Sequence, residues 1–258
     1  MKKFLIVPVL VLALLGAAGA PGLASASEGV RLDRAPIDVA DLVSLQSGAR
    51  TFVNYCLNCH SASLMRYNRL RDLGLTDTQI KDNLLFTADK VGENMNIAMT
   101  KADAKEWFGA APPDLSVIAR ARGADWIYSY LRGFYRDDSR PTGWNNTVFP
   151  NVGMPHVLWP LQGQRSHSEE AVKTASGEVL KDGHGNVVKK ARFEQLVPGS
   201  MASLEYDITV RDLTAFLVWM GEPGQLQRKQ VGYLVLMVLG VMLVLTWLLK
   251  REFWKDVH

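Results

Sequence analysis

Hydrophobic residues are concentrated at the two ends of the chain. Near the N-terminus, two lysines precede an apolar run from Phe4 to Leu15, and small residues then lead to Ala26. A basic start, a short apolar core and an Ala-x-Ala ending are typical of a secretory signal peptide. Several glycines and prolines interrupt the run, which is therefore unlike a membrane-spanning helix. We predict a signal peptide over residues 1–26.

The apolar run near the C-terminus is longer. Residues 231–249 contain no charge, and Lys250 and Arg251 follow them. As a helix this run is about 28 Å long, close to the thickness of the hydrocarbon core of a bilayer. Basic residues after a span favour a cytoplasmic tail. We therefore predict a transmembrane anchor with a short cytoplasmic tail over residues 228–258, and an exported domain over residues 27–227.

The exported domain is expected to be mainly α, because its apolar residues recur at helical spacing. Residues 28–41 are expected to be extended and residues 136–164 to be loop-like. Asp114 and Asp125 are expected to cap helices, and Gly123 and Gly221 to end them. The predicted helices cover residues 44–55, 76–86, 114–122, 126–135 and 207–220.

Residues 177–193 have a different pattern. Their centre reads Asp182-Gly183-His184-Gly185-Asn186 and their outer positions are charged. Such a turn sequence between two short runs is typical of a β-hairpin. We predict a surface hairpin here, inserted into the helical domain.

The formal net charge of +3 is carried by the two terminal segments. Without Lys2, Lys3 and the basic residues that flank the anchor, the exported domain is mildly acidic. A mildly acidic domain is not expected to bind nucleic acid, which requires basic patches.

The strongest chemical motif is Cys56-Leu57-Asn58-Cys59-His60. Cys-x-x-Cys-His is the attachment signature of c-type haem, in which two thiols form thioethers and the histidine ligates the iron. A zinc site would need further Cys or His ligands at similar spacing, and the chain has only two cysteines. A redox pair of the thioredoxin type would need a βαβ context, which is missing here. We predict one covalently bound haem c, with Cys56 and Cys59 attaching it and His60 as an axial ligand.

The second axial ligand determines the chemistry of such a haem. Met201 precedes the last soluble helix, and the two ligands of a small haem domain usually come from opposite ends of the chain. Met154 and His156 remain alternatives. A buried methionine can also serve only to fill a gap in the core.

Several segments resemble the cytochrome c1 family, in its proteobacterial branch. The similarity covers nearly the whole mature chain and includes the C-terminal anchor. The segments that carry it are residues 56–61 and 67–70, Trp107-Phe108-Gly109-Ala110-Ala111-Pro112-Pro113-Asp114-Leu115-Ser116, Arg120-Ala121-Arg122, Gly143-Trp144-Asn145-Asn146, Gly153-Met154-Pro155 and Pro198-Gly199-Ser200-Met201.

This resemblance implies a helical fold like that of class I cytochromes c, with loop and hairpin insertions. It implies that Met201 is the second axial ligand, that Met154 supports the haem pocket and that Arg122 reaches a haem propionate. It further implies an electron-transfer subunit of ubiquinol–cytochrome c oxidoreductase in the bacterial inner membrane, which is not an enzyme by itself.

The expected partners are cytochrome b, the Rieske iron–sulfur protein as electron donor and a soluble cytochrome c as acceptor in the periplasm. Two other functions remain open at this point. One is an anchored haem enzyme or gas sensor, in which Met201 does not ligate the iron. The other is a structural subunit with a vestigial haem.

Overall fold

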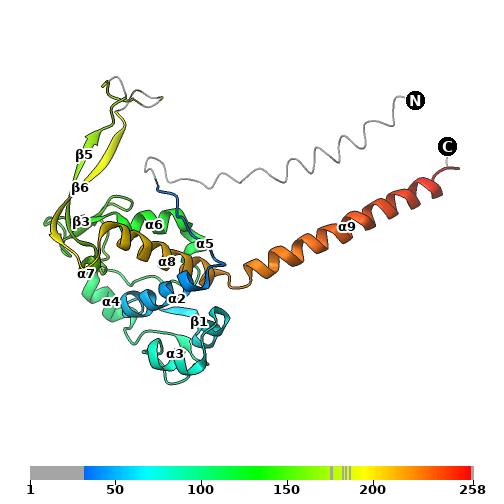
Figure 1. The fold of residues 1–258 in the computed structure, drawn as a ribbon, viewed down its shortest axis with the longest axis horizontal. Helices are drawn as coiled ribbons and strands as arrows, with labels where there is room; N and C mark the ends of the chain where they lie inside the picture. Colours follow the sequence, from blue (N-terminus) through cyan, green and yellow to red (C-terminus); the bar gives the residue numbers. More distant parts are fainter. Residues whose placement is uncertain (1–31, 175–176, 182, 184, 186, 257–258) are drawn as a thin grey trace. The chain divides into compact units, whose positions relative to one another are not determined.

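The structure is a computed structural model that describes residues 32–174, 177–181, 183, 185 and 187–256. The predicted signal peptide lies outside the described residues. The described residues form helices and short two-stranded sheets joined by loops (Figure 1). The prediction of a mainly α fold is confirmed. The helices are α2 (Leu42–Thr51), the π-helical turn η1 (Phe52–Cys56), the 3-10 segment η2 (Tyr67–Leu73), α3 (Asp77–Asn83), α4 (Lys101–Phe108), α5 (Ile118–Arg122), α6 (Ala124–Arg132), α7 (Trp159–Gln162), α8 (Ser203–Gly221) and α9 (Gln225–Phe253).

The described strands form three antiparallel pairs. The pairs are β1 (Ala62–Arg66) with β2 (Asn94–Met95), β3 (Phe134–Arg136) with β4 (Trp144–Asn146), and β5 (Gly163–Ala171) with β6 (Lys189–Pro198). A pair this small is not stable alone in water and needs helices to pack against. The strands therefore decorate a helical core.

The core of the domain is built on α2 and α8, which pack against each other. Asp41 caps α2 by accepting hydrogen bonds from the first backbone N–H groups of the helix. Leu45, Ala49 and Phe52 then fall on one buried face, and the Phe52 ring lies 5.5 Å from that of Phe216 in α8. The predicted helix 44–55 is thus confirmed as α2 continued by η1.

Two predicted helices begin elsewhere than expected. α5 starts at Ile118, and Asp114 does not cap it, because its carboxylate accepts hydrogen bonds from the backbone N–H groups of Ser63 and Ser116. α6 starts at Ala124 and ends at Arg132, and Asp125 accepts instead from the backbone of Ala35. In both cases a contact distant in sequence replaces a local cap.

Two further helices differ from expectation. The predicted helix 76–86 is shorter, and α3 begins after Thr76, which forms a reciprocal capping box with Gln79. Thr100 and Asp103 form the same motif at α4, which the sequence analysis did not predict.

The segment 136–164 is more ordered than predicted, since it contains β4 and α7. Asn146 donates to the carbonyl of Tyr130 and accepts from the backbone of Val148 and Phe149. Asn145 accepts from the backbone of Asn151. These two buried amides give a glycine- and proline-rich segment one conformation.

The hairpin is confirmed but is longer than predicted. Its arms pair from Gly163 with Pro198 to Ala171 with Lys189, and beyond them two isolated bridges join Lys173 to Val179 and Lys181 to Val187. Residues 182, 184 and 186 of the predicted turn lie outside the described residues. At the base, the Arg165 guanidinium donates to the carbonyl of Phe134 at 3.1 Å, which ties β5 to β3.

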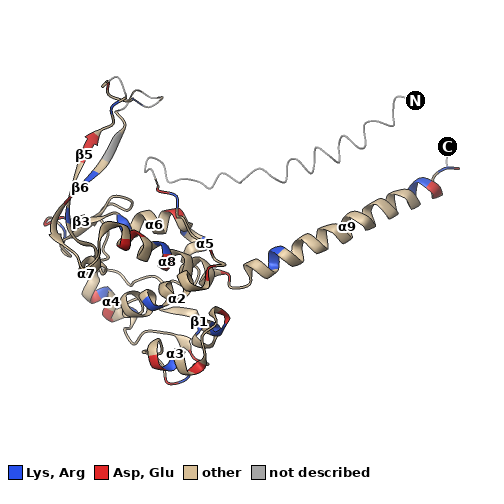
Figure 2. Cartoon of the chain, in the orientation of Figure 1, with Lys and Arg blue, Asp and Glu red and all other residues tan. Residues whose placement is uncertain are grey.

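After α8, which extends the predicted helix 207–220 in both directions, the chain enters α9. α9 is the one helix among the described residues that is long and apolar enough to cross a membrane. Figure 2 shows an uncharged stretch between the basic residues near its two ends. This stretch contains residues 231–249, the predicted span.

Candidate haem site

The two cysteines lie where the first helix ends. η1 continues α2 with wider turns, and the backbone then folds back so that the N–H groups of Cys59 and His60 both donate to the carbonyl of Cys56. Cys56 is buried, Cys59 is half-buried, and both are free thiols. The motif thus presents two thiols and an imidazole from one compact turn.

The electrostatics of this turn oppose a thiolate. Burial, with a smaller contribution from Cys59, raises the pKa of the Cys56 thiol to about 12. Zinc ligation and thiol–disulfide exchange both use the thiolate. Within the described part of the chain, no group of three or more His, Cys, Asp or Glu side chains is placed to hold a metal ion. The described residues thus offer no further ligands that would complete a zinc site at this motif.

His60 is held in one orientation by the segment 112–116. Its Nδ1 lies 2.7 Å from the carbonyl oxygen of Pro113, and this oxygen can only accept, so Nδ1 carries the proton. Nε2 is then the nitrogen with a free lone pair. Burial lowers the pKa of His60, which keeps the imidazole neutral at pH 7. A neutral histidine whose second nitrogen donates to a backbone carbonyl is the usual form of a metal-ligating histidine.

Further contacts fix the Pro113 carbonyl beside His60. The backbone N–H of Leu115 donates to the carbonyl of Ser61 at 2.8 Å, and the N–H of Leu64 donates to Ser116 Oγ at 3.0 Å. The sequence contains the motif around Pro113 but does not indicate that this segment contacts His60. Only the fold shows that it supports the imidazole.

Met201 lies on the short connection between β6 and α8. It is half-buried and packs against the same hydrophobic cluster that contains Cys56. Thr209 Oγ1, in the second turn of α8, lies 3.5 Å from Met201 Sδ. Met201 and Cys56 therefore belong to the same hydrophobic cluster.

Met154 packs in a different place. The Tyr130 hydroxyl donates to its sulfur at 3.3 Å, and its side chain packs against a smaller cluster of Phe134, Trp144 and Val152. This is the environment of a methionine that fills a gap between aromatic rings.

His156 is also committed to packing. Its ring is stacked on Phe134 with centroids 4.8 Å apart and meets Trp144 edge-on at 5.1 Å. Nε2 lies 2.8 Å from Gln162 Oε1, and burial lowers the pKa of His156 to about 3. Its Nε2 proton is thus used in a buried hydrogen bond.

Arg122 ends α5 and is exposed. Its guanidinium carbon lies 5.1 Å from the ring centroid of Trp126, a cation–π contact. Among the described residues Arg122 has no acidic partner, and its guanidinium faces solvent over the Trp126 ring. A carboxylate ligand can approach such a guanidinium without breaking an ion pair.

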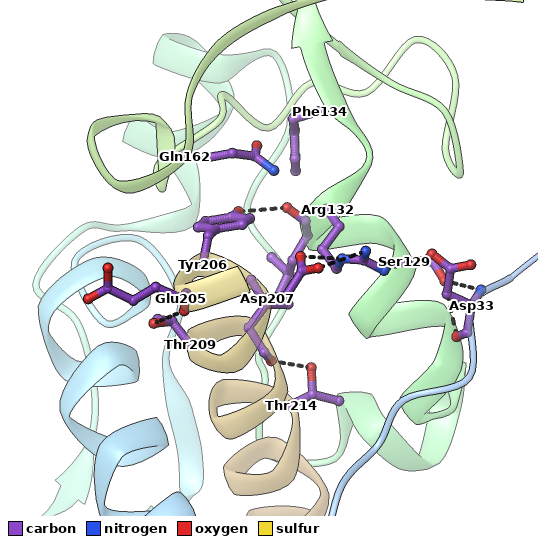
Figure 3. Close-up of polar contacts among 12 residues, drawn as sticks. Asp33, Ser129, Arg132, Phe134, Gln162, Glu205, Tyr206, Asp207, Thr209 and Thr214 are labelled. Carbon is purple, nitrogen blue, oxygen red and sulfur yellow. Dashed lines mark hydrogen bonds and ion pairs between the residues drawn. The ribbon is translucent and has the colours of Figure 1, made fainter. Parts of the chain in front are cut away.

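A polar network that was not predicted from the sequence lies at the start of α8 (Figure 3). Arg132 bonds Asp207 through Nε at 2.7 Å and Asp33 through Nη1 at 2.7 Å. The buried Tyr206 hydroxyl donates to the carbonyl of Leu131 at 2.9 Å. The network joins α6, α8 and the N-terminal segment, and no local sequence signal predicts it.

These residues fit a haem c. Cys56 and Cys59 offer two thiols at the required spacing, His60 offers a free Nε2, and Met201 offers a thioether from a distant segment packed on the same core.

Comparison with known proteins identifies the family of the chain. The model of the "Cytochrome C1 family" matches residues 34–182 and 199–257. The chain belongs to the cytochrome c1 family. It is 45% identical to the cytochrome c1 of Allochromatium vinosum over the whole of both chains. It is 30% identical to that of Rhodospirillum rubrum, over 84% of this chain and 83% of the relative.

A third relative has a different name. The ammonia monooxygenase gamma subunit of Nitrosomonas europaea is 48% identical to this chain, over 100% of this chain and 99% of the relative.

The family model leaves out residues 183–198, which include β6 of the hairpin.

Membership of the cytochrome c1 family confirms several predictions. The protein is an electron-transfer haem subunit of the bc1 type, and its cofactor is one covalently attached haem c. The apolar α9 agrees with a protein anchored in a membrane.

Proposed function

We propose that Cys56 and Cys59 attach the haem, that His60 and Met201 are its axial ligands, and that the domain passes electrons from the Rieske iron–sulfur protein to a soluble cytochrome c. The observation that carries this proposal is the hydrogen bond from His60 Nδ1 to the Pro113 carbonyl, which leaves Nε2 free as a ligand. Haem c bound here supplies a one-electron ferric–ferrous couple.

The protein residues contribute position and exclusion of water. The thiols hold the cofactor covalently at the end of η1, and the Pro113 carbonyl fixes the tautomer and plane of His60. With His60 and Met201 both held by a close-packed core, little in the protein would have to rearrange when an electron arrives or leaves. Arg122, over Trp126, is our candidate for a haem propionate.

The same proposal places the domain in the periplasm. Residues 1–26 export the chain, residues 27–227 form the haem domain, and residues 228–258 form the anchor and the cytoplasmic tail. Lys250 and Arg251, at the end of α9, favour a cytoplasmic C-terminus. α9 would then hold the domain beside cytochrome b in the inner membrane.

A second candidate function comes from the relative named ammonia monooxygenase gamma subunit. By that likeness, the same haem domain would serve an ammonia monooxygenase. Affinity purification of the full-length protein from its native membrane separates the two. We expect cytochrome b and the iron–sulfur protein to co-purify, whereas recovery of monooxygenase subunits in their place would favour the second function.

The ligand assignment is tested with Met201→Leu and Met154→Leu in the full-length protein. Met201→Leu should keep the haem attached, lower its reduction potential and allow carbon monoxide to bind, because thioether ligation favours ferrous iron. Met154→Leu is the matched control: it should cost about 1.5 kcal/mol of stability or less and leave the iron six-coordinate. Carbon monoxide binding in the Met154 variant alone would show that the assignment is wrong. Binding in the unmodified protein would favour a gas sensor or haem enzyme.

A further inference from the structure

The segment that carries Met201 is held by the end of α7. The carbonyl oxygens of Pro160 and Leu161 accept hydrogen bonds from the backbone N–H groups of Ser200 at 3.0 Å and Met201 at 3.1 Å. The last carbonyls of a helix have no partner inside the helix. Here the chain that leads to Met201 supplies those partners, so the position of Met201 depends on the position of α7.

The next carbonyl of α7 is used in the same way. Gln195 Nε2, from β6, donates to the carbonyl of Gln162 at 3.1 Å and to that of Val197 at 2.7 Å. The two segments cross closely at Gly163 and Gly199, since a Cβ on Gly199 would lie 2.5 Å from the backbone nitrogen of Gly163. The crossing therefore has no room for a side chain at Gly199.

α7 is in turn fixed by a buried side-chain hydrogen bond. Gln162 Oε1 lies 2.8 Å from Nε2 of His156, whose side chain is packed by Phe134 and Trp144. His156 is 2% exposed. Figure 3 shows the Gln162 side chain beside Phe134. A four-residue helix has little stability of its own, so this contact provides the fixed point for its C-terminal end.

We propose that His156 and Gln162 are positioning residues for Met201: their hydrogen bond fixes α7, and the α7 carbonyls place the methionine on the iron. This inference rests on the proposed role of Met201 as axial ligand. The affinity of a side-chain ligand for its metal is higher when the protein already holds that side chain in the bound position. Weakening the His156–Gln162 contact therefore releases Met201 without removing any atom of the haem site.

The test compares Gln162→Met with the unmodified full-length protein. Methionine keeps the length of the side chain but removes the acceptor, and the buried N–H of His156 loses its partner. We expect the carbon monoxide affinity of the ferrous protein to rise about tenfold, equivalent to about 1.4 kcal/mol. We also expect the charge-transfer band of methionine-ligated ferric haem to weaken, while the haem stays covalently bound. His156→Phe, which keeps an aromatic ring but lacks the N–H, should have the same effect.

Two controls separate positioning from general loss of stability. Gln162→Glu keeps an acceptor for His156 and should restore the band. Ser44→Ala removes a buried hydrogen bond of 2.6 Å to Asp212, between α2 and α8, and should lower the melting temperature without increasing carbon monoxide binding.

The inference is wrong if Gln162→Met and His156→Phe leave both signals within twofold of the unmodified protein while Met201→Leu opens the iron. It is also wrong if Ser44→Ala opens the iron as much as they do. Failure of Met201→Leu itself to open the iron would overturn the ligand assignment, and the positioning role with it.

Discussion

α8 and α9 are consecutive apolar helices with opposite surroundings. They are separated by residues 222–224, and they contain 19 and 29 residues. α8 buries most of one face in the domain, and even its Asp212 is buried, bonded to Ser44 and Arg211. In α9, none of the described residues is buried.

The difference shows what composition alone leaves open. A helix that is apolar on one side can bury that side against the domain. A helix that is apolar on all sides needs an apolar environment all round it, which the domain does not provide. α8 finds that cover in α2, which leads to Cys56, and in α6. α8 begins just after Met201 and packs on the helix that leads to the proposed haem attachment site, and α9 is left for the membrane.

The largest expected effect comes from removing α9. A chain that stops at Gln227 loses the whole uncharged stretch, in which each Leu or Val contributes roughly 0.3–0.6 kcal/mol to membrane insertion. We expect a soluble periplasmic protein that still carries haem. Fractionation of cells that lack the partner subunits measures this, and tight membrane retention of the shortened chain would contradict the distinction between the two helices.

Local signals explain what the sequence predicted well. The Cys56–His60 motif and the uncharged span are contiguous, so both could be read without a fold. The support of His60 by Pro113 joins residues 53 positions apart in sequence. Asp114 and Asp125 have the side chains of helix caps but bond distant backbone instead. Those choices depend on packing, which a local pattern does not contain.

The second axial ligand could be predicted from the sequence only in part. Three candidates for the second axial ligand remained from residues alone, and the fold separates their surroundings. His156 bonds Gln162, Met154 bonds Tyr130, and Met201 packs on the core of Cys56. The ligand assignment itself stays a proposal. α4 was missed although Thr100 and Asp103 have the spacing of a capping box.

A smaller effect is expected from truncating a side chain in α8. Phe216 is fully buried between the rings of Phe52, at 5.5 Å, and Trp219, at 5.7 Å. Phe216→Ala should lower the free energy of unfolding by about 3–5 kcal/mol, because it removes apolar contacts and leaves a cavity. Denaturant titration in detergent, followed by circular dichroism, measures the change.

Leu243→Ala in α9 is the matched control for this substitution. Leu243 is exposed in the structure, so the unfolding of the haem domain should change by about 0.5 kcal/mol or less. Equal losses at Phe216 and Leu243 would mean that α9 packs on the domain.

The smallest effect is expected from adding one methyl group, and it should be seen in a helix of the domain core but not in α9. Alanine is favoured over glycine inside a helix by about 1 kcal/mol. At Gly48 in α2, however, a Cβ would lie 2.7 Å from the Cβ of Phe216 and would collide with the carbonyl oxygen of Asp212.

Overpacking of this kind costs about 1–3 kcal/mol. Less the gain of about 1 kcal/mol in helix propensity, Gly48→Ala should destabilise the domain by up to about 2 kcal/mol net, because a backbone carbonyl cannot move aside as a side chain can. Gly240 in α9 has no atom within 4 Å of its Cβ position. Gly240→Ala should therefore leave the unfolding of the domain unchanged. Parallel denaturant titrations of the two variants decide the matter, since a gain of stability at Gly48 would mean that α2 and α8 do not approach as closely as the structure has them.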